Sequence, residues 1–97
     1  MRLREKTYED WGLTKDLVTE LRKKCKEIKY QPMLFEATYK ANDELAPFIY
    51  FSLSTGLSYD DISRAFYIPM CMESFYAYRR YALTIFREML NGYKENQ

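Results

Sequence analysis

The sequence predicts an all-α fold: a compact domain of four to five helices with a C-terminal helix-turn-helix and a long last helix. Apolar residues recur at steps of three and four along most of the chain, which is the period of a helix face. Serine, threonine, proline and glycine stand where helices usually begin and end, and no segment carries a convincing strand pattern. A chain of 97 residues is long enough for one core and too short for two, so residues 1–97 are expected to form a single helical domain.

The first helix is expected over residues 14–29. Thr14 is a good N-cap, because its hydroxyl can accept a hydrogen bond from the first turn. The opposite face of this helix is charged and mostly basic, and it is either a solvated surface or a surface that contacts phosphate. Tyr8, Trp11 and Leu13 precede the helix and are expected to pack onto the body as an N-terminal arm. The apolar face of the helix consists of Leu17, Val18, Leu21, Cys25 and Ile28.

Two further helices are expected in the middle of the chain. The second helix covers about residues 32–41, with Pro32 in its first turn, where a missing N–H costs nothing. The third covers about residues 44–54 and is apolar on most sides, which is typical of a central helix. Pro47 must lie in the first turn of that helix, and Gly56 is suited to end it in a left-handed conformation.

The last two helices are expected over about residues 58–66 and 72–93. Ser58 caps the shorter one, and Asp61 stands three residues later in a capping-box position. The residues of this short helix that are expected to point inward are Ile62, Ala65 and Phe66. The apolar stripe of the long helix consists of Phe75, Tyr76, Leu83, Phe86, Leu90 and Tyr93. Gly92 is expected to end the long helix before a frayed tail, residues 94–97.

The charge of the chain is unevenly distributed, although the formal net charge is only +1. Residues 1–30 hold nine basic and six acidic side chains, residues 31–63 hold one and five, and residues 64–97 hold five and three. A net charge near zero is no general signature of a nucleic-acid-binding protein. The acidic middle of the chain is the part least suited to contact phosphate groups.

Most catalytic chemistry is absent from the sequence. The chain has no histidine, so histidine-dependent nucleophiles and histidine metal ligands are excluded. Cys25 and Cys71 are isolated, which predicts neither a metal site nor a redox motif. No nucleotide-binding or hydrolase motif is present, and we expect no enzymatic activity, no cofactor and no metal. There is no secretion signal and no apolar run of membrane-spanning length, so a cytoplasmic protein without membrane contact is expected.

Residues 57–81 form the most informative stretch. They read as a short capped helix, a tight apolar connection and a second helix whose start is rich in aromatic residues and arginine. A small residue, Ala65, would let the two helices approach closely, and Ile68 would fill the gap between them. This is the logic of a helix-turn-helix, here covering about residues 57–91, in which the start of the second helix enters the major groove of DNA.

The stretch resembles the helix-turn-helix of sigma factor region four and, more closely, that of small phage-encoded transcription regulators. The matching residues are Leu57-Ser58-Tyr59, Ile62, Phe66, Ile68-Pro69, Ser74-Phe75-Tyr76-Ala77-Tyr78-Arg79-Arg80 and Ala82-Leu83. The resemblance implies binding to double-stranded DNA by a recognition helix that starts near Ser74. It implies contacts to base edges from Ser74, Ala77, Tyr78 and Arg80, and contacts to phosphate from Arg79 or Tyr81. The connection at residues 69–73 is about two residues longer than the usual turn.

Two hypotheses for the function follow. The first is a sequence-specific DNA-binding transcription regulator of phage or prophage type, acting as a homodimer or beside RNA polymerase. The second is a protein-interaction module, or an inhibitor of a host protein, that uses a helix-turn-helix-like scaffold. The second hypothesis rests on the low net charge and on Met70, Cys71 and Met72, which suit an adaptable apolar contact or simple core filling. Arg79 and Arg80 have their own alternative, as surface residues that pair with carboxylates or lie over tyrosine rings.

Overall fold

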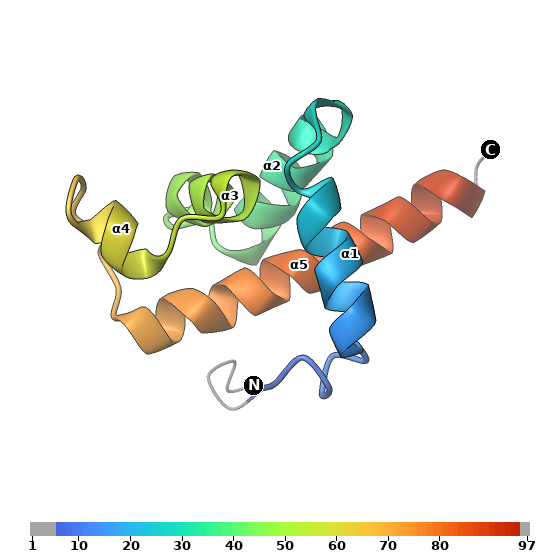
Figure 1. Cartoon of the computed structure of the whole chain (residues 1–97), viewed down its shortest axis with the longest axis horizontal. Coiled ribbons are helices and arrows are strands. Elements are labelled where there is room, and N and C mark those ends of the chain that lie inside the picture. Colours follow the sequence, from blue (N-terminus) through green and yellow to red (C-terminus); the bar gives the residue numbers. More distant parts are fainter. Residues whose placement is uncertain (1–5, 96–97) are drawn as a thin grey trace.

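The computed structural model describes the backbone of residues 6–95 and the side chains of residues 6–92. Within these limits its regular elements are all helices, and the last helix is by far the longest, which confirms the predicted fold class (Figure 1). The Cα radius of gyration is 12.9 Å, close to the roughly 13 Å expected for about 100 residues. The elements are α1 Lys15–Lys24, a 3-10 turn at Ile28–Tyr30, α2 Gln31–Ala41, α3 Ala46–Thr55, α4 Tyr59–Ser63 and α5 Met72–Glu95.

Helix α1 begins as predicted and ends earlier. The Thr14 hydroxyl accepts a hydrogen bond from the Leu17 N–H at 3.2 Å, which caps the first turn. The helix stops at Lys24, and the Gln31 side chain donates to the carbonyls of Cys25 and Glu27, at 2.8 and 2.7 Å. Ile28 therefore follows the helix instead of lying on its inner face, and it is 89% exposed. The predicted C-terminal boundary and the inward position of Ile28 are wrong.

Helices α2 and α3 both carry proline in the first turn, as the sequence predicts. Helix α3 starts slightly later than expected, because the Asn42 side chain accepts a hydrogen bond from the Leu45 N–H and holds a turn before it. Gly56 ends α3 with a φ of +85°, and its N–H donates to the Ser52 carbonyl. Only one side of α3 is buried, and Phe51 on the other side is 40% exposed. The prediction of a central helix is therefore wrong.

The central element is α5, with α2 and α3 along one of its sides (Figure 1). Its buried stripe matches the prediction at Phe75, Leu83, Phe86 and Leu90. The side chain of Tyr93 lies outside the described residues, as do residues 96–97 of the predicted tail. Helix α5 passes through Gly92 and continues to Glu95, so glycine does not end it. A single glycine disfavours a helix by only about 1 kcal/mol, which is not enough to end one.

The opposite side of α5 is covered by residues 6–13, the N-terminal arm (Figure 1). Leu13 is buried in the core, and the Trp11 ring stacks on the Tyr81 ring with 5.3 Å between centroids. The predicted packing of the arm is confirmed. Ala77 and Thr84 are not part of the predicted apolar stripe of the long helix, yet they are only 1% and 6% exposed. Helix α5 is thus enclosed on more sides than its sequence pattern indicates. Over residues 6–95, the helices are all too short or too polar to cross a membrane.

Candidate interaction surfaces

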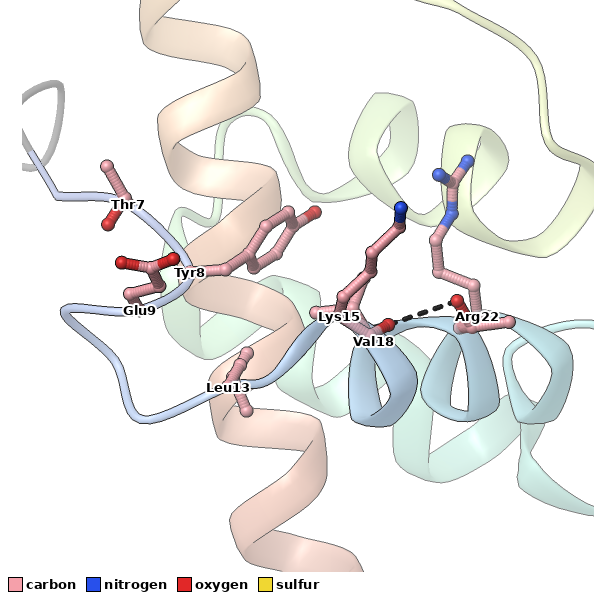
Figure 2. A pocket seen from close by; sticks show the side chains of 8 residues that line it. Thr7, Tyr8, Glu9, Leu13, Lys15, Val18 and Arg22 are labelled. Carbon is pink, nitrogen blue, oxygen red and sulfur yellow. Dashed lines mark hydrogen bonds between the residues drawn. The ribbon is translucent and has the colours of Figure 1, made fainter.

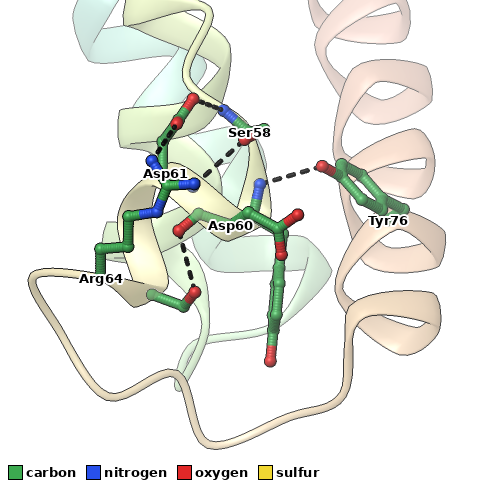
Figure 3. A network of polar contacts seen from close by, with 7 residues as sticks. Ser58, Asp60, Asp61, Arg64 and Tyr76 are labelled. Atoms are coloured by element: carbon green, nitrogen blue, oxygen red, sulfur yellow. Dashed lines mark hydrogen bonds and ion pairs between the residues drawn. The ribbon is translucent and has the colours of Figure 1, made fainter.

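The predicted helix-turn-helix corresponds to α4, a connection over residues 64–71, and α5. Helix α4 is held by a capping box, in which the Ser58 hydroxyl accepts from the Asp61 N–H at 3.1 Å and Asp61 accepts from the Ser58 N–H at 3.2 Å (Figure 3). Hydrogen bonds from the Ser58 N–H and from the Ser58 side chain hold the pKa of the Asp61 carboxyl below its usual range, and the positive charge of Arg64 adds to the effect. The Tyr59 N–H donates to the Tyr76 hydroxyl at 2.9 Å and fastens α4 to α5.

The packing between α4 and α5 differs from the prediction in one respect. Helix α4 ends at Ser63, so Ala65 and Phe66 lie in the connection and are exposed. The prediction that they point inward, with Ala65 as the close-approach residue, is wrong. Ile68 is buried, as predicted. The Tyr59 hydroxyl also donates to the Met70 carbonyl at 2.7 Å. The contact between α4 and α5, which was predicted to depend on Ala65, thus depends in large part on Tyr59.

The predicted DNA-contacting residues lie together at the start of α5, which begins at Met72, but they form no common exposed face. Ala77 is 1% exposed, and Tyr81 is covered by Trp11 of the N-terminal arm. The Arg80 Nε donates to the Lys6 carbonyl at 3.0 Å, again in the arm. A recognition helix needs these side chains free to reach base edges. In this conformation the arm occupies that surface, and only Ser74 and Tyr78 of the six remain half exposed without such a contact.

Arg79 points into the protein. Its Nη1 donates to the Ser52 hydroxyl at 3.1 Å, and its guanidinium carbon lies 4.4 Å from the centroid of the Tyr76 ring. Burial lowers the pKa of Arg79, and the positive charge of Arg22 acts in the same direction. The alternative role of a cation over a tyrosine ring thus describes Arg79, whereas Arg80 is held by a backbone carbonyl.

Three neighbouring residues that were expected to contact a partner lie in different environments: Met70, Cys71 and Met72. Met70 is half-buried against the core, while Met72 is 47% exposed. Cys71 is exposed, and its sulfur lies 3.3 Å from the Ser74 hydroxyl. Only part of the segment is therefore available as a contact surface, and Met70 acts as core filling.

A different apolar surface lies between α2, α3 and α4. It is a groove of about 320 Å³, which we call the phenylalanine groove. Phe35 of α2, Phe51 of α3 and Phe66 of the connection are 46%, 40% and 56% exposed. Sequence reasoning missed it because α3 was interpreted as central and Phe66 as inward. The lining residues are Phe35, Pro47, Phe48, Tyr50, Phe51, Ile62 and Phe66.

The elements that form the phenylalanine groove carry acidic side chains. Residues 31–63 hold five acidic and one basic side chain, and all six are exposed. Glu36 pairs with Lys40 at 3.7 Å, and Asp61 pairs with Arg64 at 3.7 Å. Asp43, Glu44 and Asp60 make no ion pair with any residue whose side chain the structure describes. The groove is thus apolar inside with negative charge on its flanking elements.

A second hollow, of about 480 Å³, lies between the N-terminal arm and α1 (Figure 2). We call it the cationic pocket. Tyr8 enters it from the arm, and Lys15 and Arg22 enter it from α1. The charged face of α1 was recognised in the sequence, but its meeting with Tyr8 depends on the fold of the arm. The lining residues are Thr7, Tyr8, Glu9, Leu13, Lys15, Val18, Thr19 and Arg22.

The described residues form no recognisable metal centre. Across residues 6–92, no three cysteine, aspartate or glutamate side chains come together as metal ligands would. Comparisons of the chain with protein-family models, with curated proteins and with solved structures find no match.

Proposed function

We propose that the protein is a protein-interaction module whose phenylalanine groove binds an apolar segment of a partner protein. The observation that carries this proposal is the arrangement of Phe35, Phe51 and Phe66, which come from three separate segments and line one groove while remaining about half exposed. Single exposed apolar residues are common on protein surfaces, but several that share one concave surface are typical of an interaction site.

The energetics favour aromatic or aliphatic anchors as the occupant. Burying one apolar side chain contributes about 1.5–3 kcal/mol. Aromatic residues in such pockets carry a large share of the binding energy of protein interfaces. A groove between helices suits an amphipathic helix, which inserts side chains spaced three and four residues apart.

The charged residues on the elements that form the groove indicate which charges the partner segment carries beside its apolar anchors. Asp43 and Glu44 precede α3, and Asp60 lies on α4, two residues before the groove residue Ile62. Carboxylates without a cationic neighbour favour lysine or arginine on the partner and disfavour acidic side chains. The partner segment is therefore an amphipathic helix with apolar anchors and basic flanks, and its association weakens as salt is added.

The test is a fluorescence anisotropy titration with three designed helical peptides of equal length. The peptides share one set of apolar anchors and carry basic, neutral or acidic flanks. We expect the basic peptide to bind best, and the Phe51→Asp/Phe66→Asp variant to bind it at least about tenfold more weakly. Tyr67→Asp is the matched control, because Tyr67 is 85% exposed, follows Phe66 directly and does not line the groove. Equal loss in both variants, or preference for the acidic peptide, contradicts the proposal.

Binding to double-stranded DNA, as in a phage-type transcription regulator, is the second candidate. It is favoured by the exposed cations of α1 and the turn that follows, Arg22, Lys23, Lys26 and Lys29. Selection from a random duplex library tests it, with Lys23→Glu/Lys29→Glu as the variant and Lys40→Glu as the control. Arg79→Glu is unsuitable, because it would place a carboxylate in a half-buried position. Absence of enriched duplexes, or equal enrichment with the variant, removes this candidate.

A further inference from the structure

The cationic pocket brings together polar groups from two segments that the sequence separates. Lys15 and Arg22 are seven residues apart, which is two turns, so both lie on one side of α1. In Figure 2 their charged ends and the Tyr8 hydroxyl all extend into the space beside α1, while Leu13 and Val18 provide an apolar lining. Glu9 also lines the pocket, and in Figure 2 its carboxylate lies below Thr7, on the far side of Tyr8 from Lys15 and Arg22.

The cations of the pocket have no anionic partner in the described part of the chain. Lys15 and Arg22 make no ion pair with a carboxylate there, in contrast to Lys40 and Arg64. Each positive charge is therefore left without a paired carboxylate among the described residues. A pocket with two uncompensated cations on one wall attracts anions more strongly than an isolated surface lysine does.

Arg79 is a third positive charge, close enough to Arg22 and Tyr8 of the pocket for both to act on it. It is half-buried, and its Nε has no hydrogen-bond partner among the described residues. Arg22 is near enough for its charge to disfavour the charged form of Arg79, and Tyr8 has the opposite effect. Buried charges of one sign are costly unless an opposite charge accompanies them. An anion between Arg22 and Tyr8 would lower this cost.

We infer that the cationic pocket binds the phosphate group of a small phosphorylated ligand. Arg22 offers the planar guanidinium that matches phosphate oxygens, Lys15 offers a mobile point charge, and Tyr8 offers a hydroxyl donor. The volume of about 480 Å³ lies within the range of small-molecule sites, about 300–1,000 Å³. The apolar lining beside Leu13 and Val18 suits the uncharged part of such a ligand. Because the N-terminal arm and α1 enclose the pocket from two sides, it suits a small ligand better than the extended backbone of a nucleic acid.

The experiment is a titration followed by two-dimensional amide NMR, using inorganic phosphate, adenosine monophosphate, sodium chloride at matched ionic strength and a short DNA duplex. We expect phosphate and the nucleotide to shift the amide signals of residues 7–22, the nucleotide at lower concentration, and chloride to leave them unchanged. The Arg22→Gln variant should bind both at least about tenfold more weakly. Lys23→Gln is the matched control, because it removes the same charge from a neighbouring exposed position outside the pocket.

Three outcomes would overturn the inference. They are shifts by chloride equal to those by phosphate, equal weakening in Arg22→Gln and Lys23→Gln, and binding of the duplex at these residues without binding of the nucleotide. The last outcome would assign the pocket to a nucleic-acid backbone instead. The inference is independent of the phenylalanine groove, so Arg22→Gln should bind the basic helical peptide no more weakly than the unmodified protein.

Discussion

The start of α5 and the outer side of α3 contrast in a way that their sequences do not suggest. The start of α5 is rich in polar and charged side chains, yet Ala77 is buried, Tyr81 is stacked under Trp11, and Arg80 is bonded to the arm. The outer side of α3 is apolar, yet Phe51 remains exposed beside Phe66. The segment that resembles a recognition helix is covered in part, and the segment that resembles core is partly open.

The short segments, and not the long helices, therefore decide which surface is available. The N-terminal arm covers α5 because one tryptophan and one leucine anchor it. The outer side of α3 stays open because α4 ends at Ser63 and leaves Phe66 in the connection. Breaking either arrangement should change which surface is available, and the expected effects differ in size.

The largest effect is expected from Trp11→Ala, which removes the anchor of the arm. Full truncation of buried tryptophan costs roughly 3–5 kcal/mol, and Trp11 is partly buried, so we expect a loss of about 2–3 kcal/mol in the free energy of unfolding. Urea denaturation followed by circular dichroism measures it. Tyr67→Ala serves as the control with a change below about 0.5 kcal/mol. A loss no larger than that of the control would mean that the arm does not hold the start of α5.

A smaller loss is expected from Ser52→Ala, at the point where α3 meets the start of α5. The buried Ser52 hydroxyl donates to the Leu57 carbonyl at 2.6 Å and accepts from the Arg79 Nη1 at 3.1 Å. Its removal leaves two partners unsatisfied, which should cost about 2 kcal/mol in chemical denaturation. Ser54→Ala is the matched control on the same helix, because its hydroxyl makes only a marginal 3.5 Å contact. Similar losses in both variants would show that Arg79 does not depend on Ser52.

Phe66→Ala should cost less still, about 1 kcal/mol, because more than half of this side chain is already exposed. The same variant should weaken the basic helical peptide at least about tenfold. Parallel measurements of peptide affinity and of the urea midpoint separate the two effects. A loss of stability as large as that of Trp11→Ala, with peptide binding intact, would identify Phe66 as a structural residue and not an anchor for a partner.

The sequence predicts the fold well because the helix signals are local. Thr14 and Ser58 cap helices as expected, Pro32 and Pro47 lie in first turns, and Gly56 ends α3. These signals act within one turn of the chain, so a single sequence contains them. A predicted helix boundary is wrong where a side chain outside the helix bonds to its end. The Gln31 side chain donates to the carbonyls of Cys25 and Glu27, and Ile28 lies beyond the end of α1.

The surfaces could not be predicted in the same way, because each depends on which segment covers which face. Nothing near Arg80 and Tyr81 in the sequence indicates that the N-terminal arm contacts them. Phe51 and Phe66 are large apolar residues of the kind that usually fill a core. They remain exposed here, where α4 ends early at Ser63. Tyr8 and Arg22 meet through the path of the arm around the start of α1.

The smallest effect is expected from acidification, which should weaken two similar aspartate caps. One is Asp10 in the N-terminal arm and the other is Asp61 at α4. Asp10 accepts hydrogen bonds from the Thr7 N–H and hydroxyl in the arm, as Asp61 accepts one from the Ser58 N–H at α4. Both caps hold the pKa of the aspartate below its ordinary value of about 4. A depressed pKa in the folded state means that the stabilisation is present above that ordinary value and is lost as the pH falls through the lower, folded value.

Acidification below about pH 4 should therefore loosen both caps, each in its own region. Asp10→Asn should remove the acid-dependent change from the fluorescence of Trp11, because Trp11 follows the Thr7–Asp10 turn directly and the chain has no other tryptophan. Asp61→Asn should leave that signal unchanged and remove the acid-dependent shift of the Ser58 amide in NMR spectra. A change of the Trp11 signal in Asp61→Asn would show that α4 and the arm respond as one unit. The covered face of α5 and the open groove could then not be altered separately.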